Sequence, residues 1–114
     1  MADWSVYWSP EARRDLEGIV EFVARRGDVE NALAVFERIA TSVDSLATMP
    51  ERGRAVPEVR LAIEPLLLEL IEAPWRIMYA CERRRVIITA IIDSRRNVGT
   101  VLESRFGLKL PDAR

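Results

Sequence analysis

Hydrophobic and polar positions alternate at the start of the chain, and the spacing then changes to that of a helix. Trp4, Val6 and Trp8 recur every second position, the period of a half-buried strand that ends at Ser9. Ser9 can cap a following helix with its hydroxyl, because the first backbone N–H groups of a helix lack partners. The residues expected on the buried side of this helix, which starts at Pro10, are Ala12, Leu16, Ile19, Val20 and Val23.

A second helix is expected directly after the first. Gly27 suits the left-handed backbone that ends a helix, and Asp28 can cap the next one. The helical stripe continues to Met49, and Pro50 stops it. The two helices therefore form a tight hairpin, and the residues expected on the buried side of the second are Ala32, Phe36, Ile39, Ala40, Val43 and Ala47.

The second half of the chain contains short apolar segments at 66–72, 75–81 and 86–92. The proline-containing stretch 50–65 before them is typical of a loop with room for one short element. Each connection between the segments is too short for a parallel crossover, which predicts an antiparallel meander. With a short final helix over 97–106, the order of strand, helical hairpin, three-stranded antiparallel meander and C-terminal helix predicts an α+β fold. A chain of 114 residues is the size of one domain, so we expect a single domain over residues 1–114.

The composition excludes several kinds of chemistry. The chain has no histidine and one cysteine, Cys81, so neither an intrachain disulfide nor a His/Cys metal site nor a Ser-His-Asp triad can form. We expect no metal and no cofactor. No apolar run is long enough to cross a membrane, and the N-terminus lacks the pattern of a secretory signal. We therefore expect a cytoplasmic protein with no membrane contact.

Charge is distributed unevenly, although the formal sum is only −1. Residues 1–64 hold eight arginines against twelve acids, whereas residues 82–105 hold six arginines against three acids. Two interpretations of the basic end stay open. The arginines could keep the sheet soluble and its edges protected, or they could contact a phosphate or an acidic protein.

Four segments stand in a characteristic order along the chain: 8–16 after the opening strand, 49–54 after the second helix, 69–79 around the Ala73–Pro74 turn, and 93–97 after the last strand. Their order and spacing resemble the RelE/ParE toxins of type II toxin–antitoxin systems, and the ParE-like branch in particular. The resemblance implies a small toxin domain with a cognate antitoxin of ParD-like or RelB-like type. The resemblance is also compatible with assembly of toxin and antitoxin into a heterotetramer or a larger complex.

The targets of this family divide. RelE-like members cut mRNA in the ribosome, using Lys, Arg and Tyr side chains, whereas ParE-like members are associated with inhibition of DNA gyrase. Ile71 stands where the nucleases tend to have arginine, Val101 or Leu102 where they tend to have tyrosine, and the only lysine is Lys109. The resemblance therefore favours a non-enzymatic, stoichiometric inhibitor that binds gyrase. An RNA endonuclease is the alternative, and so is a non-toxic member, because the family is commonly basic and this pI is about 5.6.

Two sets of residues are candidates for binding. Arginines on or just after strands can aim a guanidinium at a carboxylate or phosphate, which makes target-binding candidates of Arg76, Arg95 and Arg96. Arg105, also in the basic end, is a fourth candidate. For Arg76, Arg95 and Arg96, an internal ion pair with Glu69, Glu72 or Asp93 is the structural alternative. In a nuclease the catalytic residues would be Arg76, Tyr79, Arg95 and Arg96. Two helices cannot cover both faces of the sheet, so a groove is expected, with antitoxin-binding anchors at Trp4, Trp8, Leu67 and Trp75.

Overall fold

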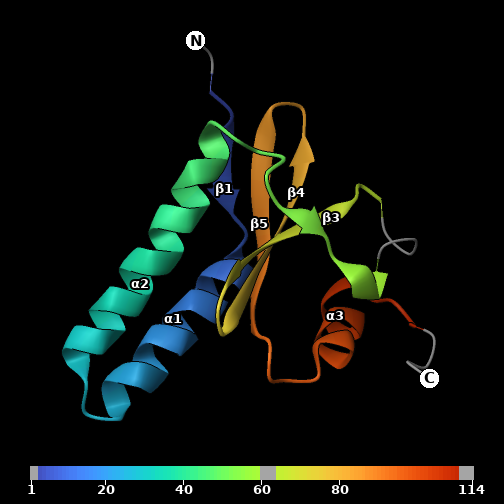
Figure 1. The fold of residues 1–114 in the computed structure, drawn as a ribbon. Helices are drawn as coiled ribbons and strands as arrows, with labels where there is room; N and C mark the ends of the chain where they lie inside the picture. Colours follow the sequence, from blue (N-terminus) through green and yellow to red (C-terminus); the bar gives the residue numbers. More distant parts are fainter. Residues whose placement is uncertain (1–2, 60–63, 111–114) are drawn as a thin grey trace.

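The computed structural model describes residues 3–59 and 64–110 (Figure 1). Its elements follow the predicted order of strand, helical hairpin, meander and terminal helix, which confirms the α+β fold. In chain order they are β1 (Ser5–Trp8), α1 (Pro10–Arg25), α2 (Val29–Asp44), the 3-10 helix η1 (Ser45–Ala47), β2 (Arg54–Ala55), the 3-10 helix η2 (Pro57–Val59), β3 (Leu67–Glu72), β4 (Trp75–Glu82), β5 (Arg85–Asp93) and α3 (Val98–Phe106).

The helix boundaries follow the capping residues. The Ser9 hydroxyl accepts a hydrogen bond from the Ala12 N–H at 3.0 Å, and the Asp28 carboxylate accepts one from the Asn31 N–H at 2.9 Å. Gly27, between the two helices, has φ +86°, a conformation that a side chain would strain. Local chemistry therefore fixes the α1–α2 hairpin at both of its starts and at its turn.

The described strands form one mixed sheet in the order β1-β5-β4-β3-β2. β3, β4 and β5 are the predicted antiparallel meander, and β1 lies parallel to the first half of β5, from Ser5 opposite Arg85 to Trp8 opposite Ile88. Beyond Ile88 no described strand pairs with that edge of β5. The expected loop at 50–65 contains β2 and η2, while residues 60–63 lie outside the described part.

Each face of the sheet has its own hydrophobic core in the described residues. The α1–α2 hairpin covers one face, where Ile39, Ile77 and Ile88 are buried together. η2 and α3 cover the other face, over Met78 and Ile92. β5 is thus buried on both sides, as its almost continuously apolar sequence predicts. No helix in the described residues is long and apolar enough to span a bilayer.

Phe36 corrects the prediction for α2. The helix buries Val35, which is 4% exposed, whereas Phe36 is 43% exposed and was expected in the core. The face toward the sheet runs through Ala32, Val35 and Ile39, so Phe36 falls just outside it. The apolar surface of α2 is therefore wider than the sheet can cover.

Candidate functional site

A groove of about 510 Å³ runs between α1 and the end of β5. Its apolar part comes from the outer side of α1 and from the sheet, and its rim is cationic. The groove joins one expected antitoxin anchor, Trp75, with two expected target-binding arginines, Arg95 and Arg96. We call it the α1–β5 groove, and its lining residues are Arg14, Asp15, Gly18, Ile19, Phe22, Val23, Trp75, Ile91, Asp93, Arg95 and Arg96.

Arg95 and Arg96 reach the groove because they follow the end of β5. Arg95 donates from Nε and Nη2 to the Asp93 carboxylate at 2.9 and 2.6 Å, and its backbone N–H donates to the same group at 2.8 Å. These hydrogen bonds hold the pKa of Asp93 below its usual range. The Arg96 side chain is exposed and makes no hydrogen bond within residues 3–59 and 64–110. The rim therefore offers a guanidinium that a partner can bind.

Arg105 has a different position from the one expected of a target-binding residue. Its guanidinium pairs with Asp15 of α1 at 3.0 and 3.1 Å and donates to the Thr89 carbonyl at 2.8 Å. Asp15 also accepts from the Ile91 N–H at 2.9 Å. The two side chains thus satisfy the backbone of β5 where β1 no longer pairs with it. Arg105, which lies in α3, therefore links this helix to β5 and to α1 through its hydrogen bonds.

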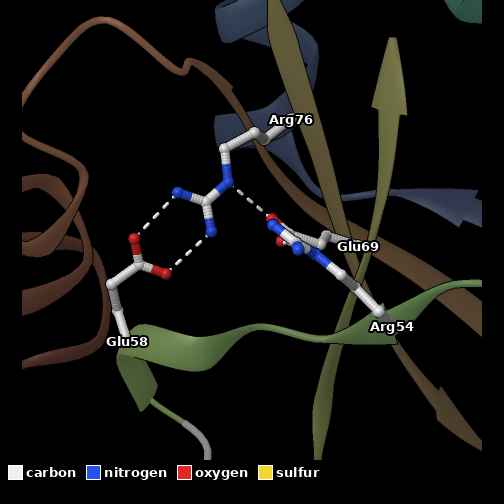
Figure 2. Close-up of polar contacts among 4 residues, drawn as sticks. All are labelled: Arg54, Glu58, Glu69 and Arg76. Carbon is white, nitrogen blue, oxygen red and sulfur yellow. Dashed lines mark hydrogen bonds and ion pairs between the residues drawn. The ribbon is translucent and has the colours of Figure 1, made fainter. Parts of the chain in front are cut away.

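Arg76 belongs to a group of charges that we call the charged cluster: Arg54, Glu58, Glu69 and Arg76 (Figure 2). Arg76 and Glu69 are buried, whereas Arg54 and Glu58 are exposed. Arg76 donates to both oxygens of Glu58 at 2.8 and 2.7 Å and, from Nε, to Glu69 at 2.6 Å. Arg54 donates to the other Glu69 oxygen at 2.8 Å. The internal pair with Glu69 is confirmed. Glu58 was missed, because nothing in the sequence of the 50–65 loop placed η2 over the sheet.

The electrostatics of the charged cluster follow from this geometry. Hydrogen bonds from Arg76 lower the pKa of Glu58, and the Glu58 carboxylate raises the pKa of Arg76. Both ends of the Arg76 guanidinium are occupied, so the residue holds η2 against the sheet. Contact of Arg76 with a target would require η2 to move.

Tyr79 is buried on the face of the sheet that the helical hairpin covers. Its hydroxyl accepts a hydrogen bond from the Gly53 N–H at 2.9 Å, and burial raises its pKa. A Cβ at Gly53 would lie 2.5 Å from that hydroxyl and 2.6 Å from the Glu69 carbonyl, so only glycine fits this approach. The phenol is therefore enclosed, away from the exposed Arg95.

The remaining antitoxin anchors differ in accessibility. Trp4 and Trp8 are half-buried against the core under the helical hairpin. Leu67 is 2% exposed and lies in the second core with Val56 and Val59, so contact with a partner would require that cover to move. Trp75 is largely buried but lines the α1–β5 groove, which also contains Phe22 at 60% exposure. Phe22 was not among the expected anchors, although its place outside the buried stripe of α1 is a signal in the sequence.

Comparison with known proteins gives the family. The model of the ParE toxin of the type II toxin–antitoxin system parDE matches residues 6–98. The chain belongs to the ParE toxin family. A search of curated proteins found no significant match. In the described residues of this ParE-family chain, no group of three or more Cys, Asp or Glu side chains could hold a metal ion.

Solved structures agree with this family in fold. One is the chromosomal ParDE toxin–antitoxin system of P. aeruginosa, with TM-score 0.65 and 21% identity, covering 79% of this chain and 95% of that chain. Another is the toxin–antitoxin complex RelBE2 of Mycobacterium tuberculosis, with TM-score 0.54 and 18% identity, covering 82% and 93% of the two chains. At these identities the likeness shows the ParE/RelE-like fold alone.

Proposed function

We propose that this ParE-family toxin acts in the cytoplasm as a stoichiometric inhibitor that binds DNA gyrase, and that a cognate antitoxin neutralises it. Membership in the toxin family supports the general role. The similar structures are toxin–antitoxin systems, which supports an antitoxin partner of ParD-like or RelB-like type. Gyrase is the target that the resemblance to the ParE-like branch favours.

One observation carries the choice of binding over cleavage: the four candidate nuclease residues do not share one surface. Arg76 is enclosed by Glu58 and Glu69, and the Tyr79 hydroxyl is bound to the Gly53 N–H. A ribonuclease needs cationic groups and a proton donor or acceptor that face the same phosphodiester. The arrangement of these side chains therefore supports inhibition by binding.

The α1–β5 groove is the binding site that fits this function. Its apolar wall, with Phe22 and Trp75, can receive apolar anchors of a partner segment, and Arg14 and Arg96 on the rim can receive its acidic side chains. A segment of this kind, apolar on one side and acidic at its flanks, matches the expected antitoxin. Arg95 and Arg96 remain the target-binding candidates, so antitoxin and target would meet at the same groove.

The test compares two processes in purified systems: DNA supercoiling by gyrase and translation of a defined mRNA by ribosomes. We expect the protein to block supercoiling or to increase cleaved DNA complexes, and to leave translation unchanged. The variant Arg95→Ala with Arg96→Ala should inhibit supercoiling about tenfold less well or worse, since each lost charge-assisted contact is worth about 1.5–3 kcal/mol. Arg13→Gln with Arg25→Gln, two exposed residues of α1 that do not line the groove, is the control with the same loss of charge. Inhibited translation with normal supercoiling would contradict the proposal.

A further inference from the structure

The turn between β4 and β5 has an unusual pair of residues. Glu82 pairs with Arg85, so Arg83 and Arg84 alone make the turn, and their φ angles are +53° and +61°. Two-residue turns with both residues left-handed favour Asn-Gly, because other side chains are strained there. Each arginine costs on the order of 1 kcal/mol in this conformation. The fold thus tolerates strain at the two positions that carry the guanidinium groups.

The turn is also fixed in place. The Ser5 N–H donates to the Arg84 carbonyl at 3.1 Å, and the Arg84 guanidinium lies 5.6 Å from the centre of the Trp4 ring. The Trp4 N–H in turn donates to the Ala47 carbonyl at 2.9 Å. These contacts tie the turn to β1 and to the end of the helical hairpin. A ligand would therefore meet arginines whose backbone is already ordered, which reduces the entropy lost on binding.

The charges of the turn are concentrated and accessible. Arg83, Arg84 and Arg85 are all exposed, and we call them the arginine tip. In the described part of the chain, neither Arg83 nor Arg85 forms an ion pair or a side-chain hydrogen bond. In Figure 1 the tip lies at the end of the molecule opposite to the α1–α2 turn. Residues 82–85 thus carry three cationic side chains and one acid, Glu82.

We propose that the arginine tip binds the phosphate backbone of duplex DNA. The planar guanidinium group matches phosphate in geometry, and three exposed guanidinium groups at one turn can contact neighbouring phosphates of one duplex. A protein partner would need an apolar anchor, and single-stranded nucleic acid would need aromatic rings for stacking. Residues 82–85 include neither, and the neighbouring Trp4 ring is half-buried and already contacts the Arg84 guanidinium. This contact is independent of gyrase, and its test contains no gyrase.

The experiment measures binding of the full-length protein to a short fluorescent DNA duplex by anisotropy as salt is raised. The tip variant is Arg83→Asn with Arg84→Gly, which places the favoured residues at the left-handed positions. Its thermal midpoint should equal or exceed that of the unchanged protein, so weaker binding cannot reflect unfolding. Removing two phosphate contacts should lower the slope of log K against log salt by about 2 and weaken binding at low salt about tenfold or more.

The control is Arg25→Gln with Arg26→Gln, which removes the same charge at the opposite end of the molecule. It should bind the duplex as the unchanged protein does. Equal affinity and equal salt slope for the tip variant and the unchanged protein would overturn the proposal. So would a lack of duplex binding at low salt, or tighter binding to a single strand of the same length.

Discussion

The charged cluster and the α1–β5 groove both contain an arginine paired with acids, yet the two arginines do different things. The side chain of Arg76 is 9% exposed, and its partners Glu58 and Glu69 come from two other elements. The side chain of Arg95 is 75% exposed, and its partner Asp93 is two residues away. The first arrangement joins distant parts of the chain. The second is a local pair that a partner can exchange for its own acid, since water already competes for it.

The largest effect is expected from Arg76→Met. Removing this guanidinium leaves Glu69 buried with Arg54 as its remaining partner, and a broken buried pair costs about 3–5 kcal/mol. Arg95→Met, the matched change in the groove, should alter the free energy of unfolding by less than about 0.5 kcal/mol. Urea unfolding of both variants measures the difference. Similar losses in the two variants would contradict the contrast between the regions.

A double variant sharpens this comparison. Arg76→Met together with Glu69→Leu removes the buried charges instead of leaving one behind. Apolar replacement of a buried ion pair is often neutral or stabilising, so the double variant should recover at least about 1 kcal/mol relative to Arg76→Met alone. A further loss in the same urea experiment would show that the cluster itself stabilises the fold more than an apolar core would.

A smaller loss is expected at the edge of β5. Asp15→Ala removes the acceptor for the Ile91 N–H and the partner of Arg105. Because hydrogen bonds of charged groups are worth about 1.5–3 kcal/mol, the free energy of unfolding should fall by that amount. Glu17→Ala, two residues further along and on the exposed side of α1, is the control and should change stability little. Hydrogen exchange at Ile91 gives a local check, since this amide should exchange faster in Asp15→Ala.

The charged cluster should also make stability depend on pH. Arg76 lowers the pKa of Glu58 in the folded state below its ordinary value of 4.5. The pair therefore stabilises the fold above that value, and the stabilisation is lost as pH falls through the lowered pKa. Glu58→Gln should be less stable than the unchanged protein near about pH 7, and the difference should shrink toward about pH 3. A difference that stays constant in urea unfolding at both pH values would contradict this account.

The smallest effect on stability is expected in the groove. Phe22 is 60% exposed, so Phe22→Ala should change the free energy of unfolding by less than about 0.5 kcal/mol. As an apolar anchor point it should nevertheless contribute to antitoxin binding, and its loss should lower the affinity about tenfold or more. Phe36→Ala, an exposed phenylalanine outside the groove, is the matched control. A larger loss of affinity for Phe36→Ala, measured by calorimetry with the antitoxin, would place the antitoxin on the other side of α1.

Local signals explain how much of the fold could be predicted. The caps at Ser9 and Asp28, the change of period after residue 65, and the short turns of the meander each depend on neighbouring residues. The placement of Phe36 failed, because the width of an apolar stripe does not say how much of it the sheet covers.

The sites were less predictable because they depend on contacts across the chain. Arg76, Arg95 and Arg105 look alike in sequence, but Glu58 encloses the first and Asp15 holds the last. The partner acids are 18 and 90 residues away in the sequence. Contacts between residues so far apart cannot be predicted from a local sequence pattern. A groove was expected because two helices cannot cover both faces of the sheet, but η2 and α3 cover the second face, and the groove lies beside α1 instead. That Phe22 lines the groove could not be predicted, because it depends on the packing of α1 beside β5.

Stoichiometry is the most direct test of inhibition by binding. Increasing amounts of the purified protein are added to a fixed amount of gyrase, and in parallel to ribosomes that hold a labelled mRNA. The account predicts that loss of supercoiling follows a binding curve and reaches completion only when the protein equals or exceeds gyrase, while the mRNA stays intact. Specific cuts in the ribosome-bound mRNA at amounts far below that of the ribosomes would contradict it.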